Sequence, residues 1–101
     1  MLKPEKFVEF SALRILLTVA ESETLTQAGE KLNITQSAVS QALKQLESQL
    51  GAELVVRRSR PLKLTPSGRV LRKYARKLFA DMQRMHADVQ MASSHGLGKL
   101  R

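Results

Sequence analysis

The chain has 101 residues and a formal net charge of +8, with 17 lysines and arginines against nine acidic residues. A chain of this length holds one small domain and an additional element, and so small a domain buries only part of its apolar surface, which favours a partner. Disulfides and thiolate metal sites are excluded because cysteine is absent, and His86 and His95 lack the spacing of metal ligands. The sequence contains neither a signal peptide nor a run near the ~18 apolar residues of a membrane span.

The first predicted helix lies between residues 7 and 20. Its apolar residues recur at helical spacing and form one stripe, composed of Phe7, Phe10, Leu13, Leu16, Leu17 and Ala20. A stripe of this kind is typical of a helix that packs its apolar side against neighbouring helices. We therefore expect these residues in the core of the domain.

A pair of helices joined by a tight turn is predicted between residues 24 and 50. Thr24 can cap the first helix, with Gln27 three residues further on, and Thr35 can cap the second. Gly51 marks the exit of the second helix, because glycine adopts the left-handed conformation that often ends helices. Two helices in this arrangement are a helix-turn-helix signature.

The second helix of the pair has two chemically different sides. One side is apolar and contains Ala38, Val39, Ala42, Leu43, Leu46 and Leu50. The other side carries hydrogen-bonding groups with little charge, namely Ser37, Ser40, Gln41, Lys44 and Ser48. Such groups are suited to the edges of base pairs in a DNA major groove, so this helix is the candidate recognition helix.

After Gly51 the pattern changes to two short apolar runs, AELVV and LKL, on either side of a turn that contains Pro61. These runs predict a two-stranded hairpin, the wing of a winged helix-turn-helix. The wing arginines Arg57, Arg58 and Arg60 are long enough to reach phosphates beside the groove, and an arginine at the tip can also enter a narrow minor groove.

The positive charge lies almost entirely in the second half of the chain. Residues 1–50 have a net charge of −1, whereas residues 51–101 have a net charge of +9. Nine basic residues and no acidic residue lie between Arg57 and Lys77, both included. A polyanion is the natural partner of such a segment. The alternative is a solvated helix face that only aids solubility.

A long helix is predicted from residue 66 to residue 92, since Thr65 followed by Pro66 is typical of a helix start. Along this helix apolar residues alternate at spacings of four and three, as in a coiled-coil seam: Leu71, Ala75, Leu78, Met82, Met85 and Val89. An apolar seam on a charged helix is expected to pack against another apolar surface. Either a second copy of the chain provides this surface, or the helix folds back on its own domain.

Residues 28–68 closely resemble the DNA-binding domain of LysR-type transcriptional regulators, and the similarity extends over residues 10–91. The family pattern has small residues and a leucine in the first helix of the pair, S/T-Q-x-A-V-S and L-E-x-x-L-G in the second, an arginine in the wing, and L-T-x-x-G after it. The matching residues, in order and at the family spacing, are Ala28, Leu32, Thr35, Gln36, Ala38, Val39, Ser40, Leu46, Glu47, Leu50, Gly51, Arg57, Leu64, Thr65 and Gly68.

The resemblance implies a mainly α fold, with a winged helix-turn-helix of three helices and a two-stranded wing over residues 7–65 and a dimerisation helix over residues 66–92. Residues 93–101 have hinge composition and resemble the family's approach to an effector-binding domain, so the chain is expected to be the DNA-binding part of a longer regulator. In the family two linker helices pack antiparallel. At roughly 39 Å each, they would separate the winged domains by about one DNA turn.

The resemblance also assigns roles to single residues of the recognition helix. Base edges would be read by Gln36, Ser37, Ser40 and Gln41. Two of these depart from the family, because Ser37 replaces a frequent proline and Gln41 a frequent arginine. Since glutamine pairs more readily with adenine and arginine with guanine, the family's base preference is not expected at Gln41. Phosphates would be held by Thr35, Lys44 and the wing arginines.

We therefore expect a bacterial, cytoplasmic regulator of transcription that binds double-stranded DNA at two half-sites as a homodimer, without membrane association. No cofactor is expected for this segment, whereas a small-molecule effector, tetramers and contact with RNA polymerase are expected of the full-length protein. Neither a nucleophile–base pair nor a metal cluster supports an enzyme. Two alternatives stay open: a nonspecific basic nucleic-acid-binding or nucleoid-like protein, and an interaction module whose seam pairs with a different protein.

Overall fold

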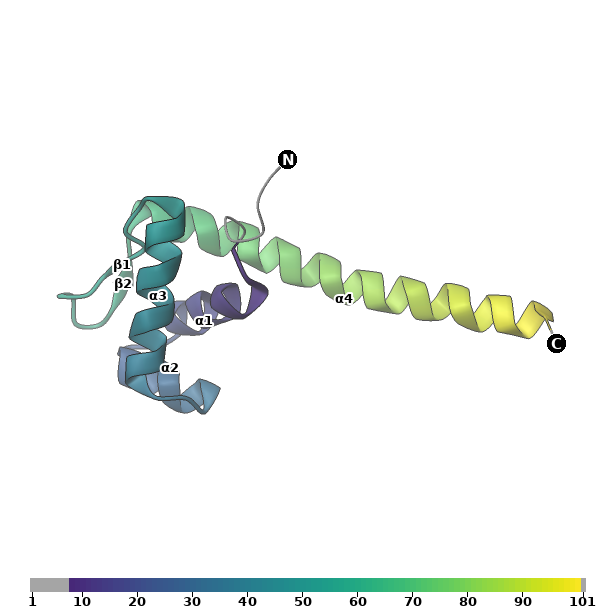
Figure 1. The fold of residues 1–101 in the computed structure, drawn as a ribbon, viewed down its shortest axis with the longest axis horizontal. Coiled ribbons are helices and arrows are strands. Elements are labelled where there is room, and N and C mark those ends of the chain that lie inside the picture. Colours follow the sequence, from purple (N-terminus) through teal and green to yellow (C-terminus); the bar gives the residue numbers. More distant parts are fainter. Residues whose placement is uncertain (1–7, 101) are drawn as a thin grey trace.

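The computed structural model describes residues 8–100, with side chains described to Ser94. Helix α1 spans Phe10–Ala20, α2 spans Leu25–Leu32 and α3 spans Gln36–Leu50. Strands β1 (Val55–Val56) and β2 (Lys63–Leu64) precede α4, which spans Pro66–Leu100. The elements from α1 to β2 form a domain at one end of α4, and α4 projects beyond it, so the molecule measures 60 × 35 × 23 Å (Figure 1).

Local signals define where the helices of the helix-turn-helix begin and end, as predicted. Thr24 Oγ1 accepts a hydrogen bond from Gln27 N at 3.0 Å, and Thr35 Oγ1 accepts one from Ala38 N at 3.0 Å. Gly51 ends α3 in the left-handed conformation, with φ 67°. These caps satisfy backbone groups that have no partner within their helix. The predicted helix-turn-helix is confirmed.

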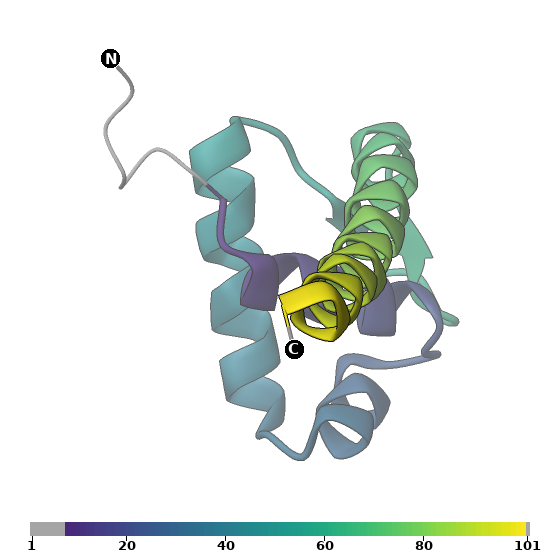
Figure 2. The same cartoon turned by 90° about the vertical axis from the view of Figure 1, so that its right-hand side faces the viewer.

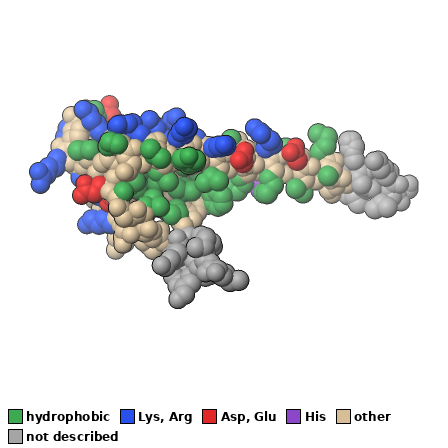
Figure 3. Space-filling model, turned by 90° about the horizontal axis from the view of Figure 1, so that it is seen from above, with side chains coloured by type: hydrophobic (Ala, Val, Ile, Leu, Met, Phe, Trp, Pro, Cys, Tyr) green, Lys and Arg blue, Asp and Glu red, His purple; other side chains and the backbone are tan. Residues whose placement is uncertain are grey.

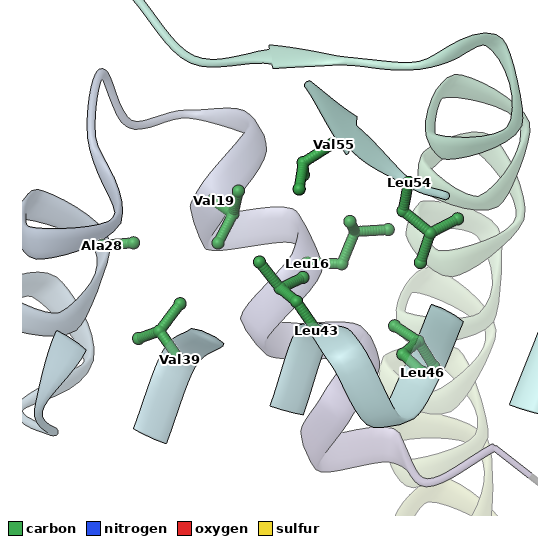
Figure 4. Packing of buried hydrophobic residues seen from close by; sticks show 8 residues of the cluster. All are labelled: Leu16, Val19, Ala28, Val39, Leu43, Leu46, Leu54 and Val55. Atoms are coloured by element: carbon green, nitrogen blue, oxygen red, sulfur yellow. The ribbon is translucent and has the colours of Figure 1, made fainter. Parts of the chain in front are cut away.

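The core lies where α1, α2 and α3 meet the start of the wing (Figure 4). Its buried members are Leu16, Val19, Ala28, Val39, Leu43, Leu46, Leu54 and Val55. Helix α1 lies between α3 on one side and α4 on the other, so more than one of its sides is covered (Figure 2). The covered surface is therefore wider than the predicted stripe and includes Val19. Phe10 is 48% exposed, with its ring edge-on to Phe79, and Phe7 lies outside the described residues.

The predicted wing is confirmed. Its two strands pair antiparallel, with Val55 opposite Leu64 and Val56 opposite Lys63. Thr65 joins the wing to α4: its amide donates to the Leu54 carbonyl at 2.9 Å, and its Oγ1 accepts a hydrogen bond from Gly68 N at 3.0 Å. Thr65 is thus the N-cap of α4, in agreement with the predicted helix start.

Gly68 packs directly against the backbone of Leu54, and a Cβ atom at this position would collide with the Leu54 carbonyl group. We expect Gly68→Ala to lower the free energy of unfolding by about 1–3 kcal/mol, the usual range for overpacking a closed contact. Urea unfolding measures this change, and Ser67→Ala, an exposed neighbour in the same turn, is the matched control. Equal stability of the two variants would show that α4 can move away from the wing without cost.

Helix α4 begins where predicted but continues past residue 92 to Leu100. Residues 93–100, which were expected to form a hinge, are therefore helical. No proline follows Pro66, and a glycine inside a helix costs only about 1 kcal/mol relative to alanine, so the helix passes through Gly96 and Gly98. Among the described helices none is long and apolar enough to cross a membrane.

The six residues of the predicted seam do not share one environment. Ala75 is fully buried, and Leu71 packs against the core of its own domain. Both were expected at a dimer seam, but Ala75 is covered by its own chain and Leu71 is partly covered by it, since α1 and β2 both contact α4. Met82 is half-buried. The accessible residues are Leu78, Met85 and Val89, which are 44%, 52% and 60% exposed.

Candidate nucleic-acid interface

The polar side of α3 lies open to solvent. Its exposed residues are Gln36, Ser37, Gln41 and Lys44. Ser40 is half-buried and is the least accessible of the residues predicted to read bases. On the opposite side Val39, Leu43 and Leu46 are buried in the core, which holds the helix in one rotation about its axis. The fold therefore presents the predicted base-reading residues together on one surface.

Thr35 and Lys44, both predicted to hold phosphates, are exposed. The Thr35 hydroxyl oxygen caps α3, so its proton remains available to an acceptor, and the first amides of α3 lie at the same end of the helix. This end carries the positive side of the helix dipole, which favours an anion. Within the described part of the chain no hydrogen bond or ion pair engages the Lys44 ammonium group.

The three wing arginines have different environments. Arg58 is exposed, and no group among the described residues forms a hydrogen bond or ion pair with its side chain. Arg60 is also exposed, but its Nη1 donates to the carbonyl oxygens of Arg57 (2.9 Å) and Ser59 (3.0 Å), so its side chain lies against its own turn. Arg57 is directed toward the carboxylate of Glu47, at the C-terminal end of α3.

Glu47 forms contacts that the sequence pattern did not reveal. Its Oε2 accepts hydrogen bonds from Leu54 N at 2.8 Å and Arg57 Nη1 at 3.2 Å, and its Oε1 lies 3.1 Å from Arg57 Nη2. Burial raises the pKa of Glu47, but the hydrogen bonds from Arg57 and Leu54 and the charge of Arg57 outweigh burial and lower this pKa overall. The pair therefore contributes its full stability above pH 4.5, and loses it as the pH falls through the lowered pKa.

The environment of Arg57 differs from the one predicted. The sequence assigned this side chain to a DNA phosphate, yet it is only 33% exposed and a carboxylate of the same chain already balances its charge. Glu47 and Arg57 are ten residues apart and meet only because the chain reverses direction after α3. The one sequence signal that could have indicated the contact is the opposite charge of two residues that both match the family pattern.

A groove of about 410 Å³ separates the wing from α2 and the start of α3. It is lined by Thr24, Leu25, Thr26, Gln36, Arg57, Arg60 and Leu62. The groove thus brings Gln36 close to two wing arginines, whereas Lys44 and Arg58 do not line it. Lysines and arginines also gather at the domain end of the molecule and along one side of α4 (Figure 3). Positive charge beside a polar helix face that carries little charge suits a polyanion that is also contacted by hydrogen bonds.

An apolar hollow lies where the end of α3 meets the start of α4. It is lined mainly by hydrophobic side chains, including Leu50, Leu54, Val70, Leu71 and Tyr74. Leu50 was expected on the covered side of the recognition helix but is 44% exposed here. For a metal ion, the described residues provide no group of three or more His, Cys, Asp or Glu side chains that could hold it.

Known proteins share this sequence and fold. Residues 10–69 match the family described as "Bacterial regulatory helix-turn-helix protein, lysR family". The chain is 38% identical to the HTH-type transcriptional regulator BenM of Acinetobacter baylyi, over 77% of this chain and 26% of BenM. The crystal structure of the BenM DBD in complex with benA site 1 DNA has a TM-score of 0.79 and 36% identity, over 82% of this chain and 96% of that chain.

A full-length structure is also similar. LysG from Corynebacterium glutamicum, with the effector Arg bound, has a TM-score of 0.75 and 34% identity, over 81% of this chain and 28% of LysG. The chain spans little more than a quarter of the length of BenM and of LysG. The matched region contains the helix-turn-helix, the wing and the start of α4. The chain belongs to the lysR family of bacterial regulatory helix-turn-helix proteins.

Proposed function

We propose that this chain is the DNA-binding part of a transcriptional regulator and recognises a specific sequence in double-stranded DNA. The observation that carries this proposal is the exposed polar side of α3, which carries little charge, beside the arginines of the wing. The DNA complex of the similar BenM DBD supports it. Base edges would be read by Gln36, Ser37, Ser40 and Gln41, and phosphates would be held by Thr35, Lys44, Arg58 and Arg60.

We further propose that two copies pair through α4. Large hydrophobic side chains are exposed along one side of α4 and at the adjoining end of α3. We name them the apolar strip: Leu50, Val70, Tyr74, Leu78, Met85 and Val89. A contiguous exposed strip of this kind marks an interaction surface. A second α4, running antiparallel, would cover it and would place two recognition helices about one DNA turn apart.

Nonspecific binding of nucleic acid is the rival function. The observation that favours it is a row of basic residues on α4, formed by Arg69, Arg72, Lys73 and Arg76. At 3.6 residues per turn this row lies on the side of α4 away from the apolar strip, so it would stay accessible in a dimer. A charged row of this kind binds any nucleic acid without reading its sequence.

Selection from a random duplex pool, followed by competition against bulk DNA, separates these functions. We expect one symmetric duplex to be enriched and to bind on the order of 10³-fold more tightly than bulk DNA at physiological salt. Equal affinity for both DNAs would favour the nonspecific function. A chain that stays monomeric and binds neither DNA would favour an interaction module for a different protein.

The salt dependence of binding is expected to identify the phosphate contacts. Arg58→Ala and Lys44→Ala should each reduce the slope of log affinity against log salt by about 0.9 and weaken binding to all sequences alike, because each variant leaves one phosphate without its cation. Titrations of labelled duplex at several salt concentrations measure the slope. Arg84→Ala, on the projecting part of α4, is the control. A changed base preference with an unchanged slope for Arg58→Ala would contradict the phosphate role.

For the whole protein we propose control by a small molecule. LysG, which is similar over this segment, is longer than the matched part and has the effector Arg bound. A corresponding effector would act on this regulator through a region outside the matched segment, and the protein would work in the bacterial cytoplasm, where its DNA lies. Tetramers and contact with RNA polymerase stay predictions, and we propose no enzymatic activity.

A further inference from the structure

The Glu47 carboxylate connects the recognition helix to the wing. Its Oε2 accepts hydrogen bonds from the Leu54 amide and from Arg57 Nη1, and its Oε1 lies 3.1 Å from Arg57 Nη2 as the second contact of the ion pair. The Glu47 side chain is only 12% exposed, so these contacts form in partial isolation from water. A guanidinium that meets a carboxylate with two of its nitrogens fixes the relative orientation of both groups, which a single point charge does not.

The position of Leu54 explains why this contact controls the wing. Leu54 is 1% exposed and directly precedes β1, and its amide would be buried without an acceptor if the Glu47 carboxylate were absent. The Leu54 carbonyl in turn accepts the Thr65 amide at 2.9 Å, which connects the same point to the start of α4. Strand β1, the first strand of the wing, is therefore held against the end of α3.

The residue that leads into β2 is held by the segment just before α2. The Leu62 amide donates to the Glu23 carbonyl at 3.0 Å, just before the N-cap of α2. In the loop between β1 and β2, the Arg57 carbonyl accepts a hydrogen bond from Arg60 Nη1 at 2.9 Å. The chain of contacts thus runs from Glu47 through Arg57 to Arg60, which lines the groove beside the recognition helix.

We propose that Glu47 and Arg57 are positioning residues for DNA binding, and that they hold the wing and Arg60 in register with the recognition helix. This assignment rests on the proposed DNA-binding function. It gives Arg57 a role that differs from that of Arg58, although the two arginines are neighbours in the same wing. Arg57 acts through the fold, with its charge balanced by Glu47, whereas Arg58 offers an unbalanced charge to a phosphate.

The salt slope of DNA binding distinguishes the two arginines. For the full chain and its selected duplex, we expect Arg57→Ala and Glu47→Gln to weaken binding on the order of tenfold with the slope unchanged, and Arg58→Ala to reduce the slope by about one. The double variant should bind no more weakly than the poorer single variant, because both substitutions remove one shared contact. Arg57→Lys keeps the charge but loses the paired nitrogens, so it should not restore binding.

The opposite results would overturn the proposal. A slope reduced by about one in Arg57→Ala, together with unchanged binding in Glu47→Gln, would make Arg57 a phosphate contact. Full restoration by Arg57→Lys would show that its charge alone is required. Thermal unfolding confirms that each variant is folded, and if Arg57→Ala does not fold, the comparison of Arg57→Lys with Glu47→Gln decides.

A measurement without DNA separates this proposal from the proposed function. Hydrogen exchange at the Leu54 amide should be slow in the unaltered chain and at least tenfold faster in Glu47→Ala, with Glu53→Ala, an exposed glutamate one residue before Leu54, as the control. Fast exchange in the unaltered chain would contradict the contact itself. If exchange follows this expectation but no duplex is preferred over bulk DNA, the wing is positioned as inferred and the proposed function fails.

Discussion

Aspartate in place of Leu78 or Met82 should convert the proposed dimer into monomers. Leu78 lies in the part of α4 that its own domain leaves accessible and is 44% exposed in the single chain, and Met82, one turn later, is half-buried. In the dimer each substitution would bury an unpaired carboxylate, which we expect to weaken association by more than about 2 kcal/mol. DNA affinity should fall on the order of 10²-fold or more, because attachment to the second half-site is lost.

Sedimentation velocity measures the assembly of these variants, and a titration with the two-half-site duplex measures their DNA affinity. Ala80→Asp is the matched control, since it introduces the same charge into an exposed position on the other side of α4. Ala75 is unsuitable as a probe, because it is fully buried in its own domain and an aspartate there would disturb the fold. Intact dimers for both Leu78→Asp and Met82→Asp would place the interface elsewhere.

The helices and the turn could be predicted because their signals are local. A threonine hydroxyl reaches an amide three residues further on, as at Thr24 and Thr35, and a glycine relieves the strain of a left-handed residue, as at Gly51. None of these effects requires a distant part of the chain. The same holds for the polar side of α3, because the burial of its opposite side follows from helical periodicity.

Contacts between distant elements could not be predicted in this way. The seam of α4 has one periodicity from Leu71 to Val89, but periodicity does not identify the surface that covers each residue, and Ala75 is buried within its own chain. The pairing of Glu47 with Arg57 likewise depends on the path of the chain after Gly51. The end of α4 was predicted too early. The serines and glycines that follow residue 92 disfavour a helix, but their cost in free energy is smaller than the stability that the rest of the long helix contributes.

Gln41→Arg is expected to change the base preference without changing the fold or the dimer. Gln41 is exposed on the same side of α3 as Ser37 and Lys44, early enough in the helix to approach a base edge. Its amide can donate to and accept from one adenine, whereas an arginine favours the O6 and N7 atoms of guanine. We therefore expect preference at one symmetric base pair of each half-site to shift toward guanine, by roughly 1–3 kcal/mol.

Binding-site selection with both proteins measures this shift at every position of the half-site. Gln49→Arg is the control, because it adds the same charge to α3 two turns later. There the side chain faces the start of α1 rather than the proposed DNA interface. This control should strengthen binding to all duplexes slightly, through charge alone, and leave the base preference as it was. If Gln41 only contacted phosphate, Gln41→Arg would behave like Gln49→Arg, with identical preferences at every position. A change confined to one base pair in each half-site instead requires that residue 41 approaches that base edge.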